Sequence, residues 1–356
     1  ALALALAACD DGDGGGSAAP DAGMGGAGGA AGMGGAGGMG GAGGMGGVGG
    51  AGGMGGGSAT GVDIASLPGP PAAGEWIQID PGGNTICSRG TPYAFYVRGG
   101  GPAKVIVDFQ GGGACWDDFT CSVADSLFND AVAGLESFRG FIDGGLDGSI
   151  FSTAEDNPFR DWTIVHVPYC TGDIHWGDAR AEYGDDLAIE HRGFVNARAA
   201  LEWVEFHRQQ PENIFVTGCS AGAYGAILHS AFIANHYPEA TVSVLADSGA
   251  GIITETFLND SLPNWGAQVN LPTFVPGLDL PITELSLPDL YINIAKAFPQ
   301  HRFAQTATAF DADQIFFFSA MGGNRFEWAG RFRDSLDAID GEVDNFRSYV
   351  PPGSMH

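Results

Sequence analysis

The chain contains one serine between small residues in a setting that suits nucleophilic chemistry. The pentapeptide GCSAG occupies residues 218–222 and has Ser220 at its centre. It follows an apolar, β-branched run at 214–217 and precedes a helical pattern at 222–237, which Pro238 would end. A Gly-x-Ser-x-Gly turn between a strand and a helix is typical of a nucleophile elbow. The alternative is a glycine-rich packing turn.

A second glycine-rich turn has the composition of an oxyanion loop. The sequence FQGGGACW occupies residues 109–116, directly after an apolar strand-like run. Glycine lets backbone N–H groups turn inward without a Cβ clash. We expect donors from Gly112, Gly113 and Ala114, together with the N–H of Ala221 after the nucleophile. A phosphate-binding loop is the weaker interpretation, because no Lys-Ser or Lys-Thr follows the glycines.

The elements that must position these turns alternate along the chain. Strands are expected at 104–109, 162–167, 214–217 and 240–246, and helices at 193–209 and 222–237. This alternation predicts an α/β fold, an α/β-hydrolase-like and mostly parallel sheet covered by helices on both faces. Residues 254–289 are rich in Pro and Leu with little periodicity. They are expected to form either a loop-rich cap insertion or a long structural loop.

The first 61 residues have a different composition from the rest. Residues 1–8 are an Ala/Leu run that leads into Cys9, which resembles a signal with a lipidation site of the bacterial lipoprotein type. An ordinary signal peptide that contains Cys is the alternative. Residues 22–57 are largely Gly-Gly-x triplets without Pro. We therefore expect a signal remnant at 1–9, a flexible tether at 10–61 and a catalytic domain at 62–356.

The charge of the chain excludes some partners. Its 15 Lys and Arg against 42 Asp and Glu give a formal net charge of −27 over 356 residues. A strongly acidic surface argues against binding of nucleic acid, because phosphate contacts need Lys and Arg. A membrane is expected to be reached only through a lipid on Cys9. The charge is consistent with solubility in an extracellular medium.

Five cysteines follow Cys9, and export would permit disulfides. Cys115 and Cys121 are close in sequence and could close a short loop, and Cys87 and Cys170 could form a second bridge. In this scheme Cys219 is left over beside Ser220. A zinc site is less consistent with the sequence, because no C-x-x-C pair occurs.

Four motifs, in order, resemble the pectin acetylesterase family, which includes the Notum carboxylesterases. They are CSRGTPYAFY at 87–96, GGGACW at 111–116, PYCTGD at 168–173 and GCSAGA at 218–223. The last motif departs from the family's pattern, because Ala223 replaces a Gly. The resemblance covers roughly residues 76–356, and the motifs together are far more specific than any one of them.

The resemblance also implies the acid and the base. The segment FDADQ at 310–314 is similar to the family's Tyr/Phe-Asp-x-x-Gln and selects Asp311, with Asp313 and then Asp247 as alternatives. The stretch YVPPGSMH at 349–356 is similar to the family's Pro-Gly-Ser-x-His and selects His356. An Asp is most often a solvated loop residue, and His356 could lie in a frayed terminus. The seven other His, which lack this context, are expected to be surface or structural residues, and His166 could line a strand end.

This set predicts an exported or cell-envelope serine esterase. Ser220 would attack an ester carbonyl, His356 would take its proton and Asp311 would hold the imidazole, so the chemistry needs no metal or organic cofactor. The resemblance implies removal of O-acetyl groups from a pectin-like polysaccharide, or of a longer acyl chain. Because the chain is acidic, we expect a neutral or small acyl ester as the substrate. A non-catalytic, surface-tethered binding protein and a serine peptidase or amidase are the alternatives.

Overall fold

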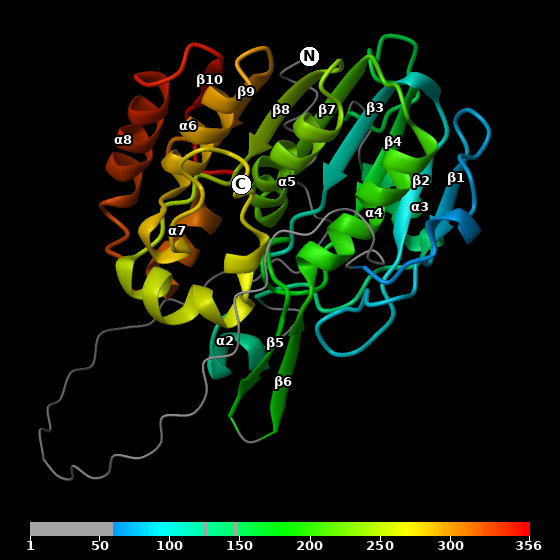
Figure 1. Cartoon of the computed structure of the whole chain (residues 1–356). Helices are drawn as coiled ribbons and strands as arrows, with labels where there is room; N and C mark the ends of the chain where they lie inside the picture. Colours follow the sequence, from blue (N-terminus) through cyan, green and yellow to red (C-terminus); the bar gives the residue numbers. More distant parts are fainter. Residues whose placement is uncertain (1–59, 124–126, 146–148, 185) are drawn as a thin grey trace, which may run out of the picture. The chain divides into compact units, whose positions relative to one another are not determined.

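A central eight-stranded sheet organises the protein, with the order β1-β2-β4-β3-β7-β8-β9-β10 (Figure 1). The computed structural model describes residues 60–123, 127–145, 149–184 and 186–356. The expected signal remnant at 1–9, with Cys9, and nearly all of the expected tether at 10–61 lie outside the described residues.

The sheet is parallel from β4 to β10, and only its first two strands run antiparallel to their neighbours. A separate antiparallel hairpin is made of β5 and β6. The strands are β1 (Trp76–Ile79), β2 (Phe95–Arg98), β3 (Gly101–Phe109), β4 (Trp162–Val167), β5 (Ala179–Tyr183), β6 (Leu187–His191), β7 (Asn213–Cys219), β8 (Thr241–Asp247), β9 (Arg302–Thr306) and β10 (Phe346–Tyr349).

Helices cover both faces of the sheet. The longer ones are α2 (Asp118–Ser122), α3 (Leu135–Gly145), α4 (Gly193–His207), α5 (Ala221–His236), α6 (Leu287–Ala297), α7 (Ala312–Ala320) and α8 (Trp328–Asp340). Side chains alternate along β3, so Val105 and Val107 enter the core cluster that contains buried residues of α4, α5, α6 and α8. Ile106 enters the cluster that contains Phe138 and Ile142 of α3. The mostly parallel α/β-hydrolase-like architecture expected from the sequence is therefore the one observed.

The strands and helices that flank the two glycine-rich turns lie where the sequence indicates. β3, β4, β7 and β8 occupy the four expected strand segments, and α4 and α5 the two expected helices. Residues 254–289 contain the short helical turns η3 (Phe257–Ser261), η4 (Leu262–Trp265), η5 (Ala267–Asn270) and η6 (Ile282–Glu284), and another turn, η2 (Ile64–Ser66), precedes the sheet. The turns η3 to η5 lie at the end of the sheet toward which the parallel strands point (Figure 1).

Two disulfides brace the loops at this end of the sheet. Cys87 is bonded to Cys170 across a Cα–Cα distance of 5.1 Å, and Cys115 is bonded to Cys121 across 4.9 Å. The expectation that Cys219 is left over is wrong, because the structure has no free cysteine among the described residues. Spacing in the sequence could not exclude a further partner for it.

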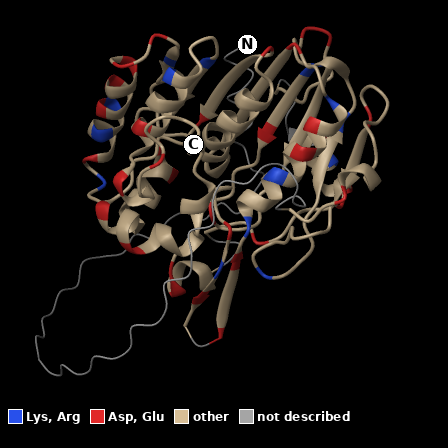
Figure 2. Cartoon of the chain, viewed as in Figure 1, with Lys and Arg blue, Asp and Glu red and all other residues tan. Residues whose placement is uncertain are grey.

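Acidic side chains are scattered over many elements, and basic ones are few (Figure 2). Within the described ranges, no helix combines the length and the apolar character that crossing a bilayer requires.

Candidate active site

Ser220 occupies a sharp turn between β7 and α5. Its backbone has φ 54° and ψ −122°, a conformation that residues with a Cβ rarely adopt. Gly222 allows the turn, because a Cβ there would lie 1.9 Å from the Phe109 carbonyl oxygen. A Cβ on Gly218 would lie 2.3 Å from the carbonyl oxygen of Gly222. The small residues of the motif are thus required by close backbone packing, and the strained serine is held at the start of a buried helix.

Ser220 opens on a small, mostly apolar cavity. The cavity has a volume of ≈ 80 Å³ and is also lined by Gly113, Ala114 and Ala221. Its remaining wall is formed by Trp116, Ile174, Tyr224, Ser248, Ile252, Ile253, Phe257, Trp265, Gln314, Phe317 and Met321. Phe257 and Trp265 come from residues 254–289, so this segment covers the site as a cap. The cavity thus brings together the expected nucleophile and both glycine-rich turns.

The loop after β3 requires glycine for steric reasons. Gly113 has φ 71°, and a Cβ there would lie 1.9 Å from the Leu127 carbonyl oxygen. Gly112 has φ 135° but does not line the cavity. The expectation that Ala114 is an oxyanion donor needs correction, because its N–H donates to the Leu127 carbonyl oxygen at 3.1 Å. Gly113 and Ala221 remain the candidate donors, and the N-terminus of α5 adds a favourable dipole.

Asp311 and His356 are joined directly. His356 Nδ1 lies 2.8 Å from Asp311 Oδ1 and 3.0 Å from Oδ2. Asp311 is fully buried and caps α7, where Oδ1 accepts from the Gln314 N–H and Oδ2 accepts from Gln314 Nε2. A carboxylate can only accept here, so Nδ1 carries the proton and Nε2 is the basic nitrogen. Because Gln314 also lines the cavity, Asp311 is hydrogen-bonded to a residue of the cavity wall.

The segment that ends at His356 is not frayed in the structure. Backbone N–H groups of Ala309, Phe310 and Ala312 donate to carbonyl oxygens of the terminal segment at 3.0–3.1 Å. Thr308 Oγ1 donates to the Met355 carbonyl oxygen at 2.6 Å. This ladder holds the imidazole beside Asp311, and the His356 side chain is only 15% exposed.

The other carboxylates proposed from the sequence lie in different surroundings. Asp313 is exposed in the first turn of α7, so it is a poor partner for a catalytic imidazole. Asp247 is buried at the end of β8, and its backbone oxygen accepts from the Ser220 N–H at 2.8 Å. Burial, reinforced by the charge of Asp311 and opposed by that of His356, raises the pKa of Asp247 to about 7.

Ser220 contacts the backbone oxygen of Asp247, and His356 acts electrostatically on the Asp247 carboxyl group, but Ser220 and His356 are not bonded to each other. In the described part of the chain no hydrogen bond joins Ser220 Oγ to the His356 ring. Hydrogen bonds of catalytic groups are often long until substrate is bound. Proton transfer from serine to imidazole would therefore require the two side chains to approach each other when substrate binds.

The remaining histidines serve structural roles more than surface ones. His166 Nδ1 lies 2.6 Å from Asp108 Oδ2, and both side chains are buried. His229 stacks on Phe109 and His175 lies edge-on to the same ring, and burial lowers the pKa values of His175 and His229 to about 4 and about 3. They are neutral packing groups beneath the elbow.

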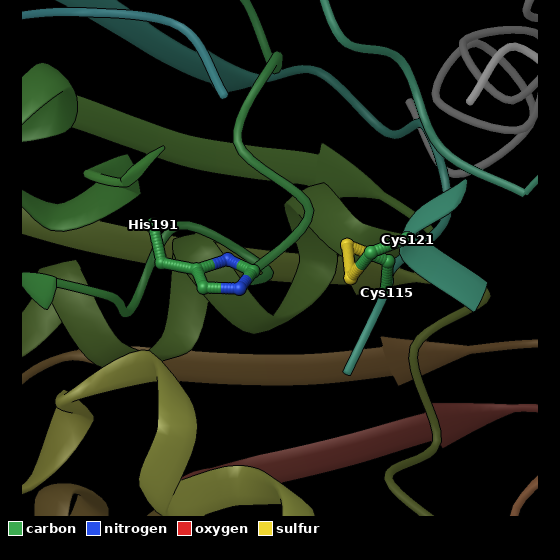
Figure 3. Close-up of side chains that lie close together, drawn as sticks. All are labelled: Cys115, Cys121 and His191. Atoms are coloured by element: carbon green, nitrogen blue, oxygen red, sulfur yellow. A yellow bond between two sulfur atoms is a disulfide. The ribbon is translucent and has the colours of Figure 1, made fainter. Parts of the chain in front are cut away.

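A cysteine–histidine cluster lies beside the oxyanion loop. The possible ligand atoms of Cys115, Cys121 and His191 are within 4.8 Å of one another (Figure 3). The two sulfurs form a disulfide, so they are not the thiolates that a metal requires. His191 Nδ1 donates to the Thr171 carbonyl oxygen at 2.8 Å, and Nε2 accepts from Tyr183 Oη at 2.9 Å. The cluster braces the loop that carries Gly113.

A model of the Pectinacetylesterase family matches residues 77–263, which is more than half of the chain. The chain belongs to the pectin acetylesterase family. The matched region contains Ser220 and the oxyanion loop, whereas Asp311 and His356 lie beyond it. The family match thus covers one part of the candidate site and not the other.

Relatives of this pectin acetylesterase family member are found in Arabidopsis thaliana. Pectin acetylesterase 11 is 30% identical over 169 residues, which cover 46% of this chain and 42% of the relative. Pectin acetylesterase 4 is 28% identical over 155 residues, which cover 42% and 36%. The chain thus spans less than half the length of these curated relatives. Among solved structures, the Wnt deacylase Notum from Drosophila matches with a TM-score of 0.49 and 16% identity over 76% of this chain and 83% of that one.

Sequence patterns did not identify the wall of the cavity. Its residues come from five separate parts of the chain, and most are single apolar side chains without a motif. Trp116 and Gln314 are exceptions, since they belong to the GGGACW motif and to the FDADQ segment that selected Asp311. Only the fold brings the others to one place.

Proposed function

We propose that the protein is a serine carboxylesterase that removes O-acyl groups, with acetyl favoured, from a carbohydrate or another ester. One observation carries the proposal: Ser220 opens on the cavity that Gly113 and Ala221 line, and Gln314 links this cavity to the Asp311–His356 pair. Membership of the pectin acetylesterase family supports the same chemistry.

In the proposed reaction, the Ser220 hydroxyl proton passes to His356 Nε2 as Oγ bonds to the acyl carbon. Asp311 holds the imidazole tautomer and stabilises its positive charge. The Gly113 and Ala221 N–H groups stabilise the oxyanion, by about 3–4 kcal/mol per donor in comparable sites. The ester C–O bond then breaks, and His356 returns the proton to the departing alcohol. Water repeats the sequence on the acyl-enzyme and releases the carboxylic acid.

The size and polarity of the cavity support a short acyl group. One water needs about 10–15 Å³ of such space, so a cavity of ≈ 80 Å³ suits an acyl group of a few carbons. The net charge of −27 disfavours long-range attraction to a polyanionic substrate such as de-esterified pectin. A neutral or fully esterified substrate is therefore favoured.

A second cavity supports longer acyl chains as the second candidate. It has a volume of ≈ 50 Å³ and shares Ile174, Tyr224, Ile253 and Phe257 with the first. Leucines and one isoleucine of residues 258–290 line most of the rest of it, together with Trp176, Gly251 and Ser286. An acyl chain that passed these four shared residues would meet mostly apolar surface.

Aryl esters of graded acyl length test both candidates. The parent is expected to hydrolyse aryl acetate, and Ser220→Ala is expected to lose this activity. Ser319→Ala is the matched control, because Ser319 is exposed on α7. Equal activity of Ser220→Ala and the parent, or an inactive parent with an intact fold, contradicts the proposal. A preference for octanoate over acetate would favour the second candidate.

We also propose that the enzyme acts outside the cytoplasm and that Cys9 carries a lipid on its sulfur, which in the lipidated form would not be available for a disulfide. The apolar run before Cys9 and the two disulfides support this, because disulfides persist mainly in oxidising compartments. Metabolic labelling with a radioactive fatty acid should mark the parent but not Cys9→Ser. Labelling of Cys9→Ser, or no labelling of either in a host that processes lipoproteins, would contradict the anchor.

A further inference from the structure

A second carboxyl group, that of Asp247, lies directly behind the elbow. Asp247 is the last residue of β8, pairs in register with Cys219 and is only 2% exposed. Its backbone carbonyl oxygen accepts from the Ser220 N–H at 2.8 Å. The next residue, Ser248, has φ 51° and lines the cavity. The backbone of Asp247 is thus bonded to that of the nucleophile, and both Ser220 and Ser248 have positive φ angles.

This carboxyl group has few hydrogen-bond donors for a buried one. Oδ1 accepts from Ser248 Oγ at 3.4 Å, and the buried Oδ2 has no partner among the described residues. Its neighbour in register on β9, Thr306, also has a buried hydroxyl without a partner there. Buried polar atoms are normally hydrogen-bonded, so each such exception calls for an explanation.

Asp173 shows what a structural carboxylate looks like in this fold. It is fully buried, and its oxygens accept from the Gly193 N–H at 2.7 Å, Thr171 Oγ1 at 2.6 Å and the His175 N–H at 3.3 Å. Through these hydrogen bonds Asp173 connects the loop after β4 to the start of α4. Asp247 has no comparable set, so loop fixation does not account for it.

The charged and titratable groups around Asp247 belong to the active site. His356 and Asp311 both act on its carboxyl group electrostatically, His356 favouring the charged form and Asp311 the neutral form. From α5, Tyr224 faces the same region, and burial raises its pKa to about 12, so it stays neutral. Cys219, on β7, is not a free thiol and does not titrate.

We propose that Asp247 is a positioning residue that tunes the basicity of His356 by changing its own charge. This inference rests on the proposed esterase function. When Asp247 is ionised, its charge favours the imidazolium that forms as Ser220 loses its proton. When Asp247 is protonated, this support is absent, and only Asp311 acts on His356. The serine proton still passes to His356 Nε2, and Asp247 exchanges its own proton with solvent only.

The protonation state of Asp247 should therefore be visible in the pH dependence of the enzyme. Burial raises the pKa of Asp247 to about 7, so its charge changes near neutral pH. Activity should rise in two steps with pH, one for His356 and one for Asp247. Asp247→Asn keeps the size of the side chain but cannot ionise, so it should lose the second step.

The experiment compares full-length parent, Asp247→Asn and Thr306→Val. It measures kcat/KM for aryl acetate from pH 5 to 9 and follows the His356 imidazole by NMR over the same range. At pH 8 we expect kcat/KM of Asp247→Asn to fall about three- to tenfold, as expected for one lost charge near the site. The His356 pKa should fall with it. Thr306→Val removes the neighbouring unpartnered hydroxyl and should change neither readout.

Each result decides the inference. A folded Asp247→Asn with the parent's pH profile and the parent's His356 titration overturns it. If Asp247→Asn does not fold, NMR of the parent decides, since the Asp247 carboxyl carbon and the His356 ring must report a shared inflection near pH 7. Independent single titrations of the two groups overturn the inference. An inactive parent whose His356 is still coupled to Asp247 contradicts the esterase proposal alone.

Discussion

His356 Nδ1 faces both oxygens of the Asp311 carboxylate, at 2.8 and 3.0 Å, although the two residues are 45 positions apart. Asp311 is held in turn by the N–H and the side chain of Gln314. The carboxylate therefore sets both the direction of the imidazole and the nitrogen that is free to accept a proton.

Replacing Asp311 by Asn should remove most of the activity. An amide can turn its NH₂ toward Nδ1 and so stabilise the wrong tautomer, which in a comparable triad lowers kcat by about 10⁴-fold. We expect a loss of about 10³- to 10⁴-fold in kcat on aryl acetate. Asp313→Asn is the matched control, because Asp313 is exposed two residues away. A similar loss in both variants would show that Asp311 has no special role.

Gly113→Ala should remove most of the activity, whereas the same substitution at a glycine outside the site should not. The added Cβ would lie 1.9 Å from the Leu127 carbonyl oxygen, at a backbone φ of 71° that disfavours L-residues. The oxyanion loop must then move, and kcat should fall about 100-fold or more. Gly140 is an exposed position of α3 with open space around a new Cβ. Gly140→Ala should therefore keep full activity and gain up to about 1 kcal/mol of stability. Parental kcat in a folded Gly113→Ala would exclude this loop from the site.

Ile253→Ala should widen the passage between the two apolar cavities. Ile253 lines both of them, whereas Ile252 lines only the cavity at Ser220. In Ile253→Ala, the octanoyl chain of the substrate should bury two or three more methylenes, at about 0.8 kcal/mol each. The octanoate-to-acetate ratio of kcat/KM should therefore rise by about 10- to 50-fold. Ile252→Ala should raise the ratio less. Equal ratios in both variants would show that the second cavity does not receive the acyl chain.

Asp247→Asn should change the pH dependence of stability in a defined direction. In the parent, the raised folded-state pKa of Asp247 means that the native state binds this proton more tightly than the unfolded chain. The resulting stability is present below about pH 4 and is lost as pH rises toward about 7. Asn has no such loss, so the stability of the variant relative to the parent should rise by roughly 2–4 kcal/mol between pH 4 and 8.

Urea unfolding of both proteins at pH 4, 6 and 8 measures this difference. Asp344→Asn serves as the control, because Asp344 is exposed near β10. A difference between Asp247→Asn and the parent that stays constant with pH would mean that Asp247 is ionised throughout the range.

Local sequence patterns were sufficient for the parts of the fold that consist of contiguous buried strands and helices. β3, β4, β7, β8, α4 and α5 carry long apolar runs or clear helical spacing, and they lie where those patterns predict. The edge strands β1 and β10 have only 4 residues each and are partly exposed, so their patterns are too short to be distinctive. Residues 254–289 became a cap because their side chains pack over a cavity that other segments form.

The sequence by itself was sufficient to predict Ser220 as the nucleophile, because its turn needs only the immediate neighbours: Gly218 and Gly222 permit the close contact between strand and helix. The family resemblance of the sequence also selected Asp311 and His356, whereas the tertiary structure supplied the contact between them and narrowed the candidate oxyanion donors. Asp247, Asp311 and Asp313 are chemically alike in the sequence, and burial beside His356 distinguishes Asp311 from the exposed Asp313. Likewise, only folding places the Leu127 carbonyl oxygen where it accepts a hydrogen bond from the Ala114 N–H. The physical reason is that a turn depends on local sterics, whereas the charge and bonding of a side chain depend on groups that distant segments bring to it.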